Sequence, residues 1–131
     1  MRESKVLKSM SKFIFPYIII YGIYVTMYGN LTPGGGFQGG VIIATGIMLI
    51  NFFKDVEFNL IKLSFYEKII YLLILVFSTI SYFTKGYSFT NFLSYNKTLF
   101  LVLLNFTIGL KVTLGLINII ETFLEEGDRF D

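Results

Sequence analysis

Asn30-Leu31-Thr32-Pro33-Gly34-Gly35-Gly36-Phe37-Gln38-Gly39-Gly40 is the stretch of sequence that decides how this chain folds. The proline fixes one backbone angle, and the consecutive glycines can adopt positive φ values that other residues avoid. The stretch interrupts an apolar sequence and leads directly into the apolar segment 41–53. We therefore expect a tight turn, followed by a helix whose first turn carries almost no side chains. Such a bare first turn invites close approach by another helix, a partner subunit or an ion.

Three interpretations of this glycine-rich stretch compete. A phosphate-binding loop requires a lysine directly after the glycines, and none is present. The spacing from Gly34 to Gly39 fits a loose dinucleotide-binding pattern, but no strand–helix–strand unit surrounds it. Gly36, Gly40 and Ala44 are four residues apart, which is the spacing of small residues that lets membrane helices approach closely. Helix packing is therefore the favoured interpretation, with a direct ligand or ion role as the alternative.

The composition indicates an all-α integral membrane protein. Of the 131 residues 54% are hydrophobic and only 15% are charged, whereas soluble domains carry about 25% charged residues. We expect a single domain over residues 1–131 in the cell membrane, crossing it several times in contact with the lipid bilayer. The absence of cysteine and histidine excludes thiol chemistry, histidine-ligated haem and the usual zinc sites. The net charge of +2 gives no reason to expect a nucleic acid partner.

About four transmembrane helices are predicted from the apolar runs, at residues 13–28, 37–53, 69–83 and 98–124. The third helix has Tyr66 as an alternative start, and the charged connector 54–68 is expected to form a loop or a surface helix. The second run is short, because a full crossing usually needs about 20 residues. We therefore expect the glycine turn to lie partly within the membrane, buried in protein.

The distribution of basic residues predicts the orientation. Cytoplasmic segments of membrane proteins are enriched in lysine and arginine. With the amino terminus inside, the inner segments hold Arg2, Lys5, Lys8, Lys12, Lys54, Lys62, Lys68 and Arg129, and the outer ones hold Lys85 and Lys97. Both termini are therefore predicted to be cytoplasmic, with the glycine turn on the outer side.

Tyrosines in the first predicted helix are spaced so that they share one face. They are Tyr17, Tyr21, Tyr24 and Tyr28, at intervals of 4, 3 and 4 residues. Because a hydroxyl deep in a membrane needs a hydrogen-bond partner, we expect this face to pack against protein.

Lys111 is the one charged residue predicted to lie inside a membrane span and away from its ends. It is 13 residues from both Thr98 and Leu124, which corresponds to about 20 Å of helix in either direction. A charge at that depth costs at least about 2.5–3.5 kcal/mol, so it should face protein or water and have a partner. The helix face agrees, since it forms a small and polar stripe of Thr107, Lys111, Gly115, Asn118 and Thr122.

No acid of this chain is an evident buried partner for Lys111. Glu121 is nearly three turns away, and Glu67 lies near the end of a predicted span. We therefore infer that the partner comes from another subunit, or that Lys111 is neutral in a desolvated site. Two interpretations remain, a lysine in or beside an ion pathway and a subunit contact.

The run from Gly29 to Gly40 resembles the G-H-x-x-P-G-G-G-F-x-G-G signature of the MnhB/MrpB family. The members are small subunits of Mrp-type sodium/proton antiporters, with relatives in membrane-bound hydrogenase and sulfane-sulfur-reductase complexes. Asn30 stands where the family usually has histidine, so a titrating role there is not implied. The segment 108–112 resembles a second, weaker motif in the last helix of the family. The motif positions are Pro33, Gly34, Gly35, Gly36, Phe37, Gly39 and Gly40.

The resemblance implies a subunit without catalytic residues or cofactor, which packs its glycine-rich helix and its Lys111 helix against sister subunits. Lys111, Thr107, Asn118 and Gly115 would then line an ion pathway or a subunit contact, with sodium ions and protons as the transported species. The complex would be a stand-alone antiporter or the ion-pumping arm of a redox-driven, hydrogenase-like enzyme. Two other functions stay open, namely a purely structural scaffold subunit and an independent small transporter.

Overall fold

Every regular element in the part of the chain described by the computed structural model, residues 5–54, 58–91 and 96–130, is an α-helix. The four helices are α1 (Lys5–Met27), α2 (Gly36–Lys54), α3 (Leu60–Lys85) and α4 (Lys97–Phe130). The predicted all-α membrane class is confirmed, because α1, α2 and α4 are each long and apolar enough to cross a membrane. The additional crossing by α3 stays a prediction.

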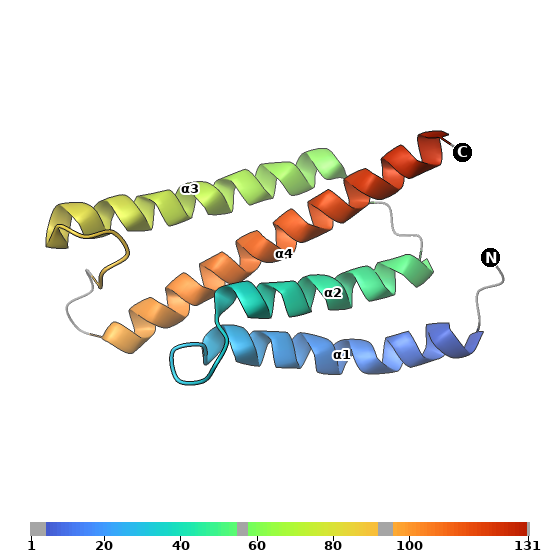
Figure 1. Cartoon of the computed structure of the whole chain (residues 1–131), viewed down its shortest axis with the longest axis horizontal. Helices are drawn as coiled ribbons and strands as arrows, with labels where there is room; N and C mark the ends of the chain where they lie inside the picture. The colour runs from blue at the N-terminus through green and yellow to red at the C-terminus, as the bar shows by residue number, and fades with distance from the viewer. Residues whose placement is uncertain (1–4, 55–57, 92–95, 131) are drawn as a thin grey trace.

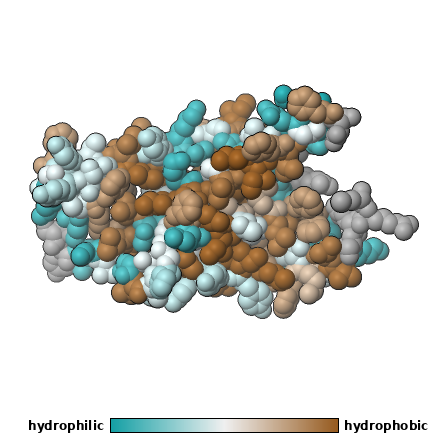
Figure 2. Space-filling model, viewed as in Figure 1, coloured by the Kyte–Doolittle hydropathy of each residue, from teal (hydrophilic) through white to brown (hydrophobic). Residues whose placement is uncertain are grey.

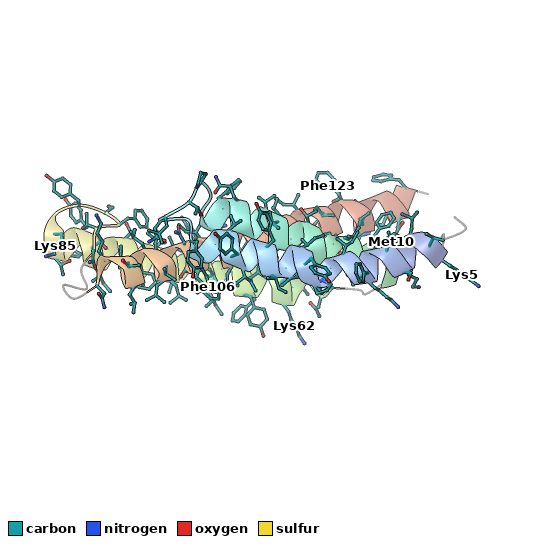
Figure 3. The ribbon with its side chains drawn as sticks, turned by 90° about the horizontal axis from the view of Figure 1, so that it is seen from below. Lys5, Met10, Lys62, Lys85, Phe106 and Phe123 are labelled. Carbon is teal, nitrogen blue, oxygen red and sulfur yellow. The ribbon has the colours of Figure 1, made fainter. Side chains whose placement is uncertain are left out.

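The helices lie side by side in one flat layer (Figures 1 and 3). Their spatial order is α1, α2, α4 and α3, and α4 runs diagonally between α2 and α3 (Figure 1). Within the described residues α4 contacts all three other helices, whereas α3 contacts α4 alone. The last helix in sequence is therefore the element that holds the layer together.

The two ends of the layer differ in which segments they hold. The first residues of α1 and the last residues of α4 lie at the same end, and the turn between α1 and α2 lies toward the other end (Figure 1). Lys85 and Lys5 lie at opposite ends of the layer (Figure 3). This arrangement puts both described chain ends on one side, and the assignment of that side to the cytoplasm stays a prediction.

The core is narrow and formed of few residues, because a single layer buries only the helix edges. The buried apolar residues are Val25, Ala44, Phe100 and Ile117. Large apolar side chains instead cover the visible face of the layer (Figure 2). Such a surface suits contact with lipid or with other membrane subunits.

The tyrosine face of α1 is part of this exposed surface. Tyr17, Tyr21, Tyr24 and Tyr28 are all between 47% and 61% exposed. The prediction that this face packs against protein is therefore not met within the chain itself.

Helix boundaries differ from the predicted ones in α1, which begins at Lys5 instead of residue 13, and in α3 and α4. Asn59 caps α3, its side chain accepting a hydrogen bond from the Lys62 amide at 3.2 Å, so the helix begins at Leu60 within the expected connector. Gly86, with φ of 77°, ends the helix and donates its amide to the Tyr82 carbonyl. Helix α4 has 34 residues and continues through the acidic tail, giving about 50 Å against a membrane core of about 30 Å.

Candidate functional site

The glycine-rich turn adopts the backbone geometry that its composition predicts. Gly34 and Gly35 have φ values of 147° and 142°, which only glycine adopts readily. Helix α2 then begins at Gly36, with the amide of Gly39 bonded to the carbonyl of Gly35 at 2.9 Å. Within the motif, Gly35, Gly36, Gly39 and Gly40 are buried, and Pro33, Gly34 and Phe37 are exposed.

The bare first turn of α2 is where three helices meet. A Cβ placed on Gly39 would collide with Thr26 Oγ1 of α1, and one on Gly36 would collide with the Asn105 carbonyl of α4. A Cβ on Gly40 would lie 2.6 Å from the carbonyl of Gly109. We call these contacts among α1, α2 and α4 the glycine node. The close helix approach predicted from the spacing of Gly36 and Gly40 is confirmed, and an ion-binding role for the motif stays a prediction.

Hydrogen bonds and small residues reinforce the glycine node. Thr26 donates to the Gly22 carbonyl at 2.8 Å, so its hydroxyl is held where α2 passes. The hydroxyl of Thr113 in α4 lies 3.1 Å from the Gly40 carbonyl and 2.8 Å from the Gly109 carbonyl. Backbone atoms of neighbouring helices therefore lie close together, which a larger side chain at these positions would prevent.

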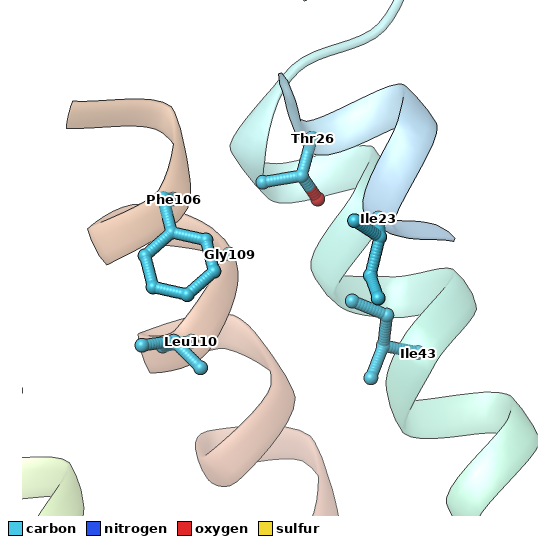
Figure 4. Close-up of a pocket in the computed structure, with 6 residues that line it drawn as sticks. All are labelled: Ile23, Thr26, Ile43, Phe106, Gly109 and Leu110. Atoms are coloured by element: carbon cyan, nitrogen blue, oxygen red, sulfur yellow. The ribbon is translucent and has the colours of Figure 1, made fainter. Parts of the chain in front are cut away.

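The glycine turn is recessed relative to the start of α4. Gly36 lies against Asn105, which is eight residues after Lys97, or about 12 Å along the helix. Next to the node, a shallow apolar hollow opens between α4 and the α1–α2 pair (Figure 4). Its lining residues are Ile23, Thr26, Ile43, Phe106, Gly109 and Leu110. That the turn lies partly within the membrane stays a prediction.

A polar cluster joins α3 to α4 around Lys111. The Lys111 ammonium forms an ion pair with Glu67 Oε1 at 3.1 Å, and it lies 5.7 Å from the centre of the Tyr71 ring. The Asn118 amide donates to Ser64 Oγ at 3.0 Å and to Glu67 Oε2 at 3.4 Å. Glu67 therefore accepts from two donors of α4, one on each carboxylate oxygen. We call this group of five side chains the Lys111 cluster.

The inference that Lys111 lacks an acidic partner within this chain was wrong. That inference placed Glu67 near the end of a span, whereas α3 begins at Leu60 and carries Glu67 about two turns inside the helix. The available signal was Asn59 directly before the apolar residues Leu60 and Ile61, which is a helix start. Both charges are only partly buried within the chain, with 33% of the Lys111 side chain and 25% of the Glu67 side chain exposed.

The other residues of the predicted stripe fall into two groups. Gly115 lies beside the cluster, because a Cβ there would be 3.3 Å from Glu67 Oε1. Thr107 instead donates to the Leu103 carbonyl of its own helix at 2.8 Å. The structure therefore brings Lys111, Gly115 and Asn118 together and leaves Thr107 outside. Sequence reasoning missed the partners on α3, namely Ser64, Glu67 and Tyr71.

A second polar contact, absent from the predicted set, joins α2 to α4. The Asn51 amide donates to Glu121 Oε1, and each of these two residues is only 8% exposed. Asn51 Oδ1 is also buried, and it has no hydrogen-bond partner. Within the described residues, no group of three or more His, Cys, Asp or Glu side chains could hold a metal ion.

Comparison with known families matches residues 6–118 to the domain related to the MnhB subunit of Na⁺/H⁺ antiporters. A candidate antiporter subunit of Staphylococcus epidermidis, named mnhB2, is 38% identical over 58 residues, covering 44% of this chain and 41% of that protein. The mnhB2 protein of Staphylococcus saprophyticus is 33% identical over 64 residues, covering 48% and 45% respectively. The matched part thus spans less than half the length of these relatives.

Among solved structures, the fold is similar to a chain of the membrane-bound sulfane sulfur reductase, an archaeal respiratory membrane complex. The TM-score is 0.78 at 26% sequence identity, and the similarity covers 95% of this chain and 59% of that chain. The flat four-helix arrangement therefore also occurs within a chain of a multisubunit membrane complex.

Proposed function

The chain belongs to the family of domains related to the MnhB subunit of Na⁺/H⁺ antiporters, and from that premise we propose that it is a non-catalytic subunit that helps to form a cation path. The family and the likeness to a chain of a respiratory membrane complex support a membrane subunit of an antiporter-like complex. Its partners are then other membrane subunits, with sodium ions and protons as the transported species.

The observation that carries this proposal is the ion pair between Lys111 and Glu67. Lys111 lies 14 residues after the start of α4, which is about 21 Å along the helix. Charged pairs at such depth in membrane proteins mark ion pathways and proton relays, because a charge that served packing alone would be replaced at lower cost by an apolar residue. Asn118 holds the second carboxylate oxygen, so the orientation of Glu67 is fixed.

The Glu67 carboxylate could take part in transport by exchanging Lys111 for a cation or a proton. A cation or a proton that arrives at the carboxylate neutralises it and weakens its attraction for Lys111. The released ammonium then repels the next cation until the first one leaves. Lys111 and Glu67 therefore favour one positive charge at a time, which is the property that an exchanger needs. The partial exposure of both side chains leaves room for such access, on a surface that sister subunits would cover.

The glycine node supports the same proposal by fixing α4. Close backbone packing against α1 and α2 sets the position of α4, and α4 alone carries α3 within the described residues. The distance between Lys111 and Glu67 is then determined by the contact between α3 and α4 on a firmly held helix. A stand-alone antiporter and the ion-pumping arm of a redox-driven complex both fit this arrangement, and the subunits that co-purify from native membranes distinguish them.

The test uses charge-removing variants in the native complex. We expect Lys111→Gln and Glu67→Gln each to lower sodium-dependent proton movement in inverted membrane vesicles at least about tenfold. The subunits recovered with the tagged chain should stay unchanged. Lys85→Gln, at the exposed end of α3, is the matched control and should transport as the wild type does.

Other outcomes identify the alternatives. Full transport in both variants would contradict the proposed cation path. Loss of assembly in both variants would support a purely structural scaffold subunit. The exchanged pair, Lys111→Glu with Glu67→Lys, should recover part of the activity if the attraction between the two side chains matters. Sodium transport by the chain purified alone would favour an independent transporter.

A further inference from the structure

Glu121 and Asn51 form a buried polar site that the Lys111 cluster does not include. Glu121 belongs to α4 and Asn51 to α2, and the amide nitrogen Nδ2 donates to carboxylate Oε1. Both side chains are more than nine-tenths buried, and the remaining amide oxygen of Asn51 has no partner. A buried amide oxygen without a partner requires an explanation, and a bound ion is one of the few available.

None of the described side chains supplies a compensating positive charge to the carboxylate at this site. Among the described side chains none forms an ion pair with Glu121, and Glu125, one turn further along α4, is another acid. Helix α2 has a single charged residue, Lys54, whose side chain lies outside the described part, and α1 has Lys5, Lys8 and Lys12 toward this end. Because buried carboxylates are normally paired or bound to a cation, the site is arranged to receive a positive charge.

The amide of Asn51 can present either of its ends to Glu121. Exchange of its nitrogen and oxygen by rotation is a change that the shape of the side chain allows. With nitrogen toward the carboxylate, the amide donates a hydrogen bond and the site is empty. With oxygen toward the carboxylate, two oxygens would face each other, and this arrangement is stable only with a cation or a proton between them. The amide nitrogen then takes the buried place of Oδ1, where water or a neighbouring subunit has to accept its hydrogen bonds. Carboxylate and amide oxygens are the ligands that hard cations prefer.

We propose that Glu121 and Asn51 form a binding site for a sodium ion, in which the carboxylate supplies the charge and Asn51 Oδ1 a neutral ligand. Water or neighbouring subunits complete the coordination, and a proton on Glu121 competes with the ion. This site is separate from the Lys111 cluster because it faces α2 instead of α3 and is ten residues further along α4, or about 15 Å. Its use in transport rests on the proposed function, whereas ion binding itself does not.

The test measures sodium binding by the intact complex in mild detergent. Sodium chloride replaces choline chloride at constant ionic strength, and the melting temperature of the complex is followed as sodium rises. We expect a sodium-dependent rise in the wild type, and at least a tenfold higher half-saturating sodium concentration in Glu121→Gln, which keeps the shape and removes the charge. Glu126→Gln, an exposed acid on the same helix, is the control and should follow the wild type.

Several results would overturn this site. An unchanged half-saturating sodium concentration in Glu121→Gln would show that sodium does not bind at this site. A melting temperature of the wild type that responds to pH but not to sodium would show that the site binds a proton instead. If Glu121→Gln does not assemble, Asn51→Asp decides the question, because an added carboxylate should tighten sodium binding. Weaker or unchanged binding in that variant would contradict the proposal. The two proposals can fail separately. If Lys111 and Glu67 are dispensable for transport but sodium still binds to the complex, the proposed cation path is refuted and the sodium site at Glu121 is not.

Discussion

Replacing Gly39 with alanine should separate α1 from α2 and destabilise the chain. A Cβ on Gly39 would collide with Thr26 Oγ1, and it would lie 2.7 Å from the Gly22 carbonyl oxygen and 2.8 Å from the Thr26 amide nitrogen. Two of these three atoms belong to the backbone, and the third is held by its hydrogen bond to Gly22. No side-chain rotation relieves the overlap, so the helices themselves must move apart.

The size of that movement sets the energetic cost. Ordinary contact begins at 3.4 Å, so the overlap with the Gly22 carbonyl alone separates the helices by at least about 0.7 Å, even if the Thr26 hydroxyl rotates away. Such a gap removes a quarter to a half of each contact between atom pairs worth about 0.1–0.2 kcal/mol. A few dozen such pairs across the interface lose about 2 kcal/mol, within the range of about 1–3 kcal/mol seen for overpacked cores. For a domain of this size that loss lowers the melting temperature by roughly 5–10 °C.

A second glycine-to-alanine variant, Gly127→Ala, serves as the control for Gly39→Ala. Gly127 also lies in a helix, and a Cβ there would meet nothing within 4 Å. Both variants gain helix propensity, worth at most about 1 kcal/mol, so the difference between them isolates the overlap at the node. We would measure thermal unfolding of both chains in mild detergent. Equal melting temperatures for Gly39→Ala and Gly127→Ala would refute the packing argument.

Three smaller changes test other contacts. Thr113→Val removes the hydroxyl contact with the Gly40 carbonyl and should lower stability by about 0.6 kcal/mol, the mean for such bonds between membrane helices, as measured by thermal unfolding. Asn59→Ala removes the cap of α3 and should cost about 1 kcal/mol, with faster hydrogen exchange confined to the first turn of that helix. Gly115→Val places branched carbons where a Cβ would already be 3.3 Å from the Glu67 carboxylate, and it should lower transport in vesicles while leaving assembly intact.

Local rules were sufficient for the turn and for most of the helices. Proline and glycine limit the backbone within a few residues of themselves, so the positive φ values of Gly34 and Gly35 follow from the sequence. Small residues at intervals of four likewise indicate which face of α2 other helices approach, and Gly36 and Gly40 lie on that face. Neither inference requires knowledge of which helix approaches.

Pairing between distant side chains was not predictable in the same way. Glu67 and Lys111 are 44 residues apart in sequence, and their contact depends on how α3 lies along α4. An error of about two turns in the start of α3 moved Glu67 to a span end and hid it as a partner. Asn51 and Glu121 were missed for the same reason, since their contact depends on the register between α2 and α4.

Helix α4 packs closely against α2 on one side and forms the ion pair with α3 on another. Its Gly109 and Thr113 contact the bare turn of α2, whereas Lys111 lies between them in sequence and faces α3. Residues two apart on a helix point to different sides, so the glycine node and the ion pair share the same turns of α4 without touching. A shift of α4 at the node would therefore move Lys111 directly. Close packing beside a charged pair holds that pair to a narrow range of distances, and this is the reason to expect small residues next to the ion pair of Lys111 and Glu67.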